Sequence, residues 1–463
     1  MKSSLAQLKP WISGAALAND ATAETDFDGV STDSRNVSST NLFVALRGER
    51  FDAHDFVAEV AAKGVAAVVV ERVPEGLTVP ALVVPDTRVA LGEMARYWRR
   101  QSSLPVIGVT GSNGKTTVKE MIAAILAAAY GADGSMATRG NLNNDIGVPM
   151  TVFRLNNSYQ AAVIELGMNH PGEIATLSAI ALPTVGLVNN AQREHQEFME
   201  SVEAVAKENG AVISSLPAHG TAVFPADDAF APLWRAYAGQ RKIMSFGLTA
   251  DADVTCTYSA NDFGSDLSIT AGTRKFNVKL AAAGEHNVRN ALAATACALA
   301  IGIPEDAVVR GLEAFAPVNG RLQRKTARNG ALMIDDTYNA NPDSMRAAID
   351  VLSNAPAPRV LVIGDMGEVG NEGPQFHGEV GAYARDRGIE HLLTLGELAV
   401  HASNAFGPSA RHFDDIGSIK QAVDALVTSD TTVLVKGSRF MKMERVVQHL
   451  MNPATPENTQ EAH

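Results

Sequence analysis

The sequence predicts an α/β protein with three domains in a row. The chain has 463 residues, which at roughly 100–200 residues per domain allows two to four domains. Short, almost uninterrupted apolar runs alternate with helical segments, as in parallel sheets that are covered on both faces. The character of the sequence changes near residues 104 and 318, so we place the domains at 1–104, 105–318 and 319–463.

Composition and charge narrow the class of protein. Apolar residues make up 46% of the chain and charged residues 19%, as in globular proteins. The net charge of −12 argues against broad binding to nucleic acid or to an anionic membrane. The longest nearly apolar run, 291–303, is too short to span a bilayer, and the N-terminus lacks the apolar region of a secretory signal. Cys256 and Cys297 lack ligand spacing, which favours a reducing compartment, so we expect a cytoplasmic protein without membrane insertion.

The first region carries strand candidates at 65–70 and 81–85, with amphipathic segments between them. The run RYWRRQSSLP at 96–105 breaks this pattern, and we interpret it as a linker. From Pro105 the order becomes strand, glycine-rich loop and helix, the helix running from Thr116 to Tyr130.

Further buried strands are expected in the central region at 161–166, 184–189 and 221–224. Alternation between 253 and 280 predicts a small antiparallel insert, followed by a helix that begins near His286. From Leu332 onward, four more apolar strands alternate with helices, which predicts a second doubly wound unit. The tail from about 452 has the composition of a disordered segment.

The stretch GVTGSNGKTT at 108–117 predicts a nucleotide site. It departs from the usual phosphate-loop spacing, because Val109 stands where the first glycine is expected. Strand, loop and helix nevertheless follow in the required order, so loop amides and a helix N-terminus can hold an anion. Lys115 can reach the β- and γ-phosphates. The residues expected to bind the phosphates are Thr110, Gly111, Ser112, Asn113, Gly114, Lys115, Thr116 and Thr117.

Two further residues follow neighbouring strands. Glu165 ends one apolar strand and His195 follows the next, at the sheet edge where α/β ligand sites form. Together with the Thr116 hydroxyl they could hold Mg²⁺, which takes few protein ligands. Taken alone, a histidine in a polar loop such as His195 is more often a surface residue than a ligand, whereas a carboxylate inside a nearly apolar strand needs a partner.

Seven spaced segments resemble the Mur ligase family. They are GVTGSNGKTT, TRGNLNNDIGVPMT, ELGMNHPGEI, GEHNVRNALAA, DDTYNANPDSM, VIGDMGEVG and VKGSRFMKME, and they extend in order over about residues 30–445. The resemblance implies a uridine-nucleotide-binding N-terminal domain, a central ATPase-like domain with a phosphate loop, and a Rossmann-like C-terminal domain. It also implies an ADP-forming ligase that activates a carboxylate as an acyl phosphate, with ATP as cosubstrate and Mg²⁺ as cofactor.

Within the family the segments are most similar to members that join D-alanyl-D-alanine to UDP-N-acetylmuramoyl-tripeptide. The resemblance implies catalytic roles for Lys115, Glu165 and His195, with Mg²⁺ on Thr116, Glu165 and His195. It implies further ATP contacts by Asn287, Asn290, Arg321 and Asp336. The implied substrate contacts are Ser34, Arg35, Thr138, Asn141, Asn143, Asn144, Tyr338, Asn339, Lys436, Ser438 and Arg439.

Several of these assignments have simpler alternatives. Asn287 could cap a helix, Ser34 and Arg35 could belong to a surface loop, and Lys436 and Arg439 could be solvated charges. Other possible functions are a ligase adding a single amino acid, a folylpolyglutamate synthase, or a regulatory ATPase with a phosphate loop. The expected partners are small-molecule substrates, and we expect a monomer.

One position departs from the family pattern. Many members carry a lysine fourteen residues after the metal-binding histidine, and its carbamate acts as a metal ligand. Here that position is Asn209, and the nearest lysine is Lys207. Val202, Val205 and Val212 share a helical face with Asn209, whereas Lys207 lies about 160° away. We therefore assign Asn209 an indirect catalytic role and predict a site that works without lysine carbamylation. The alternative is that Asn209 only ends a helix before Gly210.

Overall fold

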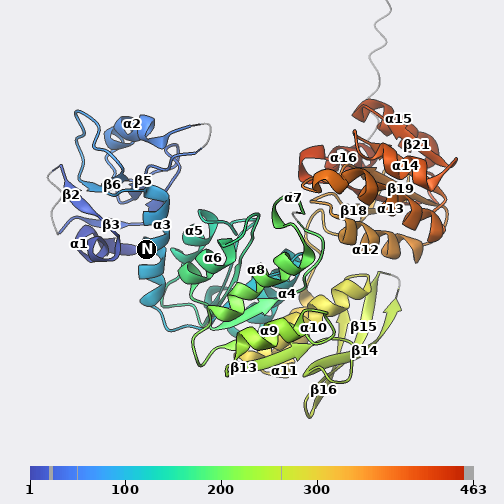
Figure 1. Cartoon of the computed structure of the whole chain (residues 1–463), viewed down its shortest axis with the longest axis horizontal. Helices are drawn as coiled ribbons and strands as arrows, with labels where there is room; N and C mark the ends of the chain where they lie inside the picture. The colour runs from blue at the N-terminus through green and yellow to red at the C-terminus, as the bar shows by residue number, and fades with distance from the viewer. Residues whose placement is uncertain (20–23, 49–50, 195, 262, 453–463) are drawn as a thin grey trace, which may run out of the picture.

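The computed structural model describes residues 1–19, 24–48, 51–194, 196–261 and 263–452. It confirms an α/β fold dominated by parallel strand pairs. Three bodies follow along the chain in Figure 1, coloured blue, green to yellow, and orange to red. In the described ranges no helix has both the length and the apolar character needed to cross a membrane. The expected disordered tail falls almost wholly on 453–463, outside the described residues.

The N-terminal body contains a five-stranded sheet in the order β2-β7-β6-β5-β4, parallel except for β2. A two-stranded ribbon, β1–β3, lies beside it. The strands are β1 (Lys2–Ser4), β2 (Ala16–Ala18), β3 (Asp26–Asp28), β4 (Val30–Ser31), β5 (Leu42–Val44), β6 (Ala67–Val70) and β7 (Ala81–Val83). The α-helices are α1 (Leu5–Leu8), α2 (Val57–Ala62) and α3 (Thr87–Arg100).

The central body is built on a nine-stranded sheet in the order β16-β15-β14-β13-β12-β11-β8-β10-β9. Its strands are β8 (Val106–Thr110), β9 (Ser135–Ala137), β10 (Ala161–Glu165), β11 (Val185–Val188), β12 (Thr221–Pro225), β13 (Lys242–Phe246), β14 (Val254–Asn261), β15 (Gly264–Ala271) and β16 (Arg274–Leu280). The helices are α4 (Lys115–Tyr130), α5 (Gly147–Val152), α6 (Glu173–Ala181), α7 (Gln196–Met199), α8 (Val202–Ser214), α9 (Ala231–Ala238), α10 (Glu285–Ala300) and α11 (Glu305–Ala314). The expected antiparallel insert is confirmed as β14–β16, which extends one edge of this sheet.

The C-terminal body has a six-stranded sheet in the order β17-β18-β22-β19-β20-β21, parallel except for β17. Its strands are β17 (Gln323–Thr326), β18 (Leu332–Asp336), β19 (Arg359–Gly364), β20 (His391–Leu395), β21 (Ala410–Phe413) and β22 (Thr432–Lys436). Its helices are α12 (Pro342–Ser353), α13 (Gly373–Asp386), α14 (Val400–Phe406), α15 (Ile416–Leu426) and α16 (Glu444–Met451). Two apolar clusters cover its strands, as a doubly wound sheet requires.

The predicted linker at 96–105 is wrong over its first half, because residues 96–100 form the last part of α3. Arg99 explains why this segment is ordered. Its buried guanidinium donates to the carbonyl oxygens of Ala181, Leu182 and Leu104 at 3.0–3.2 Å. Burial lowers the pKa of Arg99 to about 10. The N-terminal body and one face of the central sheet consequently share a single apolar cluster.

The order of the central strands determines where the candidate site lies. β8 lies between β10 and β11, and all three run parallel. Their carboxyl ends therefore open at one edge of the sheet, which is where ligands bind in open α/β sheets. The loops that follow these three strands carry the residues described next.

Candidate active site

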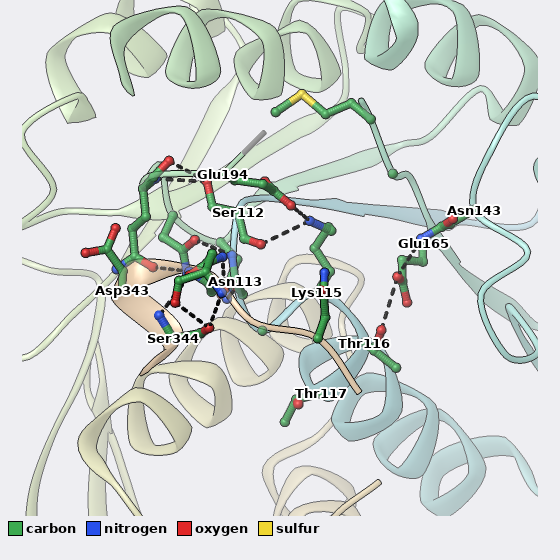
Figure 2. A pocket seen from close by; sticks show the side chains of 18 of the residues that line it. Ser112, Asn113, Lys115, Thr116, Thr117, Asn143, Glu165, Glu194, Asp343 and Ser344 are labelled. Atoms are coloured by element: carbon green, nitrogen blue, oxygen red, sulfur yellow. Dashed lines mark hydrogen bonds and ion pairs between the residues drawn. The ribbon is translucent and has the colours of Figure 1, made fainter. Parts of the chain in front are cut away.

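The phosphate loop leaves β8 and enters α4 directly (Figure 2). Gly111 and Gly114 have positive φ angles of 134° and 80°. A Cβ atom on Gly114 would lie 2.6 Å from Asn290 Oδ1 and 2.7 Å from Asn189 Nδ2. Position 114 therefore excludes a side chain, both because of its left-handed backbone and because of its neighbours. The loop ends at the N-terminus of α4, where main-chain amides and the helix dipole favour an anion.

A set of amide side chains holds this loop in place. Asn189 Nδ2 donates to Asn113 O and to Asn290 Oδ1, at 2.8 and 2.9 Å. Asn190 Oδ1 accepts from Asn113 N at 2.8 Å. Asn290 Nδ2 donates in turn to Asn287 Oδ1 at 3.1 Å. Asn189 and Asn190 were not predicted as site residues, although their place at the end of β11 was an available signal.

Lys115 is engaged by a carboxylate. Its Nζ atom lies 2.6 Å from Glu194 Oε1, and it donates to the carbonyl oxygens of Gly111 and Ser112 at 2.5 and 3.1 Å. The Lys115 and Glu194 side chains are 15% and 10% exposed. Figure 2 marks their ion pair with a dashed line. Glu194 was not predicted from the sequence. His195, the predicted second metal ligand, lies outside the described residues.

Thr116 and Glu165 meet as predicted. Glu165 Oε1 accepts from Thr116 Oγ1 at 3.1 Å and from Asn143 Nδ2 at 2.9 Å. Its other carboxylate oxygen, Oε2, is buried and has no hydrogen-bond partner among the described residues. An unpartnered buried carboxylate oxygen is costly, and oxygen ligands of this kind suit Mg²⁺, so these residues fit a magnesium ion. A cluster of three or more His, Cys, Asp or Glu is not found in the described part of the chain, which omits His195.

Arg321 and Asp336 of the C-terminal body are also predicted site residues, and Arg321 contacts Thr116. Arg321 Nη2 donates to Thr116 Oγ1 at 2.9 Å, and its guanidinium lies 4.1 Å from the ring centre of Tyr338. Asp336, at the end of β18, accepts from Leu322 N at 3.1 Å. Burial raises the pKa of Asp336, and the nearby Lys436 opposes that rise. Arg321 thus connects the start of the C-terminal body to the phosphate loop.

The side chains at the strand end 436–439 make contacts within the C-terminal body. Lys436 is only 3% exposed, because its Nζ atom lies 2.6 Å from Asp336 Oδ2 and 2.8 Å from Asn339 O. Its ammonium is therefore paired with Asp336, and its contact with a substrate carboxylate stays a prediction. Ser438 is buried and accepts from Gly367 N at 2.7 Å. Arg439 is exposed and pairs with Glu444.

The start of α10 shows that the alternative role of Asn287 as a helix cap is wrong. Gly284, not Asn287, is the N-cap of this helix, and Asn287 Nδ2 donates back to Ala283 O at 2.7 Å. Beside it, burial and the charge of Lys436 lower the pKa of His286 to about 4. His286 is therefore neutral near pH 7.

One cavity of about 1190 Å³ unites most of the predicted residues. The predicted residues that line it are Ser112, Asn113, Gly114, Lys115, Thr116, Thr117, Asn141, Asn143, Asn144, Glu165, Asn287, Asn290, Arg321, Asp336, Tyr338, Asn339 and Lys436. The described predicted residues that do not line it are Ser34, Arg35, Thr110, Gly111, Thr138, Asn209, Ser438 and Arg439.

Three residues expected to face a substrate lie elsewhere. Arg35 is exposed and pairs with Asp33 at 2.8 Å, and Ser34 O accepts from Lys63 Nζ. Both lie in the N-terminal body away from the cavity, so their proposed contacts with a uridine nucleotide stay predictions. Thr138 is buried, and its hydroxyl accepts from Glu165 N at 3.0 Å. It supports Glu165 rather than facing the cavity.

Asn209 lies where the helical pattern predicted. It is fully buried on α8, and its Oδ1 accepts from Thr110 Oγ1 at 2.6 Å. The helix continues to Ser214, so the alternative that Asn209 ends it is wrong. Lys207 is exposed and pairs with Glu203 one turn away at 2.7 Å. Asn209 thus contacts the last residue of β8, directly before the phosphate loop.

Fold and site together define a three-body α/β protein with a phosphate-loop nucleotide site between its central and C-terminal bodies. Three family descriptions match: "Mur ligase family, catalytic domain" at 26–99, "Mur ligase middle domain" at 109–298, and "Mur ligase, glutamate ligase domain" at 320–439. The chain belongs to the Mur ligase family.

Similar proteins cover nearly the whole chain. The UDP-N-acetylmuramoyl-tripeptide–D-alanyl-D-alanine ligase of Escherichia coli (strain K12) is 41% identical over 97% of this chain and 99% of its own length. The crystal structure of MurF from Acinetobacter baumannii superposes with a TM-score of 0.92 at 37% identity, covering 97% and 99% of the two chains. MurF from Thermotoga maritima in complex with ADP gives a TM-score of 0.82 at 27% identity, covering 91% and 96%.

We predict that Lys115→Ala lowers turnover by about 10²–10³-fold, the scale for loss of one preorganised charge-stabilising donor. The measurement is ATP-dependent phosphate release with all substrates present. Lys242→Ala, at the exposed start of β13, is the matched control and retains turnover. A Lys115→Ala protein that unfolds at the wild-type temperature and keeps most of its turnover contradicts this assignment.

We also predict that Glu194→Gln tightens ADP binding by about fivefold, since a partly exposed ion pair contributes up to ~1 kcal/mol. In the free protein Glu194 holds the amine that a phosphate needs, so removing its charge removes a competitor. Isothermal titration with ADP measures the change. Unchanged or weaker binding by a folded variant shows that the ion pair does not compete with the nucleotide.

Proposed function

We propose that this chain is an ATP-dependent, ADP-forming ligase that joins D-alanyl-D-alanine to UDP-N-acetylmuramoyl-tripeptide. The product is the pentapeptide precursor used in peptidoglycan and cell-wall synthesis. The observation that carries the proposal is the meeting of Lys115, the Thr116–Glu165 pair and Arg321 at one end of a cavity. The 41% identity to a ligase of this name over nearly the full length supports the choice of substrates.

In the proposed reaction the γ-phosphoryl group of ATP passes to the terminal carboxylate of the tripeptide, giving an acyl phosphate and ADP. The amine of the dipeptide then attacks the acyl carbon, and phosphate leaves as the amide forms. Lys115 and Arg321 supply positive charge beside the transferred group. Because the reacting groups are brought together and neutralised rather than covalently held by the protein, positioning is the main catalytic task.

Magnesium fits this scheme. Thr116 and Glu165 would hold it, with His195 as the further proposed ligand. When bound, the ion would supply charge neutralisation of the phosphates. Glu165 is held ready by Thr138 and Asn143, which bond its main-chain nitrogen and its Oε1 atom.

The three bodies suggest that each domain binds a different substrate. We propose that residues 1–104 bind the uridine nucleotide, 105–318 bind ATP, and 319–463 complete the nucleotide site and present the dipeptide. Asn141, Asn143 and Asn144 line the cavity where donors and acceptors without charge suit a muramoyl peptide. Lys436 supports this site through Asp336, while Ser438 and Arg439 stay predicted dipeptide contacts. We further propose that the protein acts as a monomer in the cytoplasm.

A coupled assay of phosphate release tests the function. We expect release to require ATP, UDP-N-acetylmuramoyl-tripeptide and D-alanyl-D-alanine together. Replacing the dipeptide by single amino acids, or the tripeptide by a folate, should abolish it. Release that ignores the dipeptide identifies a regulatory ATPase, and release with a single amino acid identifies a different ligase of the family.

The site is also expected to work without a modified lysine. Asn209→Ala should lower turnover by about tenfold or more, since it removes a buried hydrogen bond below the phosphate loop. Lys207→Ala is the matched control on the same helix and should leave turnover and its bicarbonate independence unchanged. An inactive Lys207→Ala protein that short-chain carboxylic acids rescue would show that Lys207 is the modified residue.

A further inference from the structure

Arg193 joins the central body to the C-terminal body outside the cavity lining. Its Nη2 atom lies 2.8 Å from Asp343 Oδ1, and its Nη1 atom lies 2.8 Å from Glu379 Oε2. The main-chain nitrogen of Arg193 also donates to Asp343 Oδ2 at 2.9 Å. The guanidinium lies 5.3 Å from the ring centre of Phe376. One side chain thus contacts both α12, through Asp343, and α13, through Glu379 and Phe376.

This contact places two carboxylates around one cation. The Arg193, Asp343 and Glu379 side chains are only 21%, 23% and 33% exposed, so solvent screens their charges incompletely. The two carboxylates raise the pKa of Arg193, and the guanidinium lowers the pKa of Glu379. Without Arg193, Asp343 and Glu379 would lose their shared ion-pair partner, and Arg346 would remain as a more distant cation near Glu379. Arg193 therefore contributes to the docking of α12 and α13 against the central body.

The residues beside Arg193 hold the phosphate loop. We call 189–194 the connector segment. In this segment the main-chain nitrogen of Gln192 donates to Ser112 Oγ at 2.9 Å. The Gln192 side chain accepts from Asn113 Nδ2 at 2.6 Å. Asn190 and Glu194 contact Asn113 and Lys115 as described above. Within six residues the chain holds the phosphate loop on one side and the C-terminal body on the other.

A second bridge runs parallel to the first. Asn341 Nδ2 donates to Asn113 Oδ1 at 2.9 Å, so the phosphate loop also touches the C-terminal body directly. Asn341 is the N-cap of α12, and its Oδ1 accepts from Ser344 N at 2.8 Å. Asp343 lies in the first turn of the same helix. The start of α12 is therefore held at two adjacent points, by Asn113 and by Arg193.

We propose that Arg193 is a positioning residue, which sets the distance between the phosphate loop and the C-terminal body that presents the amine. The inference rests on the proposed function, because it assumes that the amine comes from that body. Arg193 acts through Asp343 and Glu379 rather than through a substrate. Its loss should slow the step that needs both bodies and leave nucleotide binding by the central body intact.

Kinetics of Arg193→Gln test this role. We expect turnover to fall by roughly 10- to 100-fold, the scale of a misplacement of about 1 Å between reacting groups. The KM for the dipeptide should rise, whereas the Kd for ADP should change much less than turnover does, because the connector backbone still holds the phosphate loop and only Arg321 and Asp336 among the predicted ATP contacts belong to the C-terminal body. Arg193→Lys, which keeps the charge, should recover part of the turnover. Arg359→Gln removes a matched ion pair with Glu390 inside the C-terminal body and should leave the KM for the dipeptide unchanged.

A double-mutant cycle with Glu379→Gln separates positioning from general destabilisation, since Glu379 does not line the cavity. Turnover of the double variant should equal that of Arg193→Gln alone. Independent effects that multiply would overturn the proposal, as would wild-type kinetics for Arg193→Gln, or an ADP affinity that falls as much as turnover does.

Small-angle scattering keeps this inference distinct from the proposed function. With ADP bound, Arg193→Gln should have a larger radius of gyration than the wild type, whatever reaction the protein catalyses. If the wild type releases phosphate without the dipeptide, the proposed function fails, and the scattering comparison alone then decides the role of Arg193. Identical radii for the two proteins would refute it.

Discussion

The phosphate loop depends on a contact that leaves no room for a side chain at Gly114. Asn189, directly after β11, and Asn290, on α10, lie close to this glycine, and Asn189 donates a hydrogen bond to Asn290. The loop, the end of β11 and the start of α10 are thereby fixed as one unit. Asn290 and Asn287 are predicted ATP contacts, and the same contact joins them to the phosphate loop.

Charge is balanced in this site by residues from different parts of the chain. Lys115 pairs with Glu194, Lys436 pairs with Asp336, and Arg321 donates to Thr116. These cations are already held in place, so a bound nucleotide meets an ordered set of charges rather than flexible side chains. Such preorganisation is what makes electrostatic stabilisation effective in a site shielded from water. The Glu194 contact is the exception, because it must be exchanged for a phosphate.

Much of the fold could be predicted from local patterns. The apolar strands, the loop before α4 and the alternating insert each depend on neighbours in the sequence, and Glu165 stood out as a carboxylate in an apolar strand. The features that the sequence did not predict lie where distant segments meet. The end of α3 is ordered because Arg99 finds carbonyl oxygens some 80 residues away, and Lys436 is buried because Asp336 lies on the adjacent strand. Asn189, Asn190 and Glu194 were missed for the same reason, since their partners are set by the order of β8 and β11.

A reaction between groups that are held by two bodies requires a defined relative position of these bodies. Here the phosphate loop does not contact the C-terminal body through one residue alone. Asn113 meets Asn341, Thr116 meets Arg321, and the connector segment adds Arg193. Arg321 precedes Leu322, which bonds to Asp336 at the carboxyl end of β18, and Asn341 follows that same end, so the loop is contacted from one end of this strand. A rotation of that strand would therefore disturb the phosphate site and the cavity together.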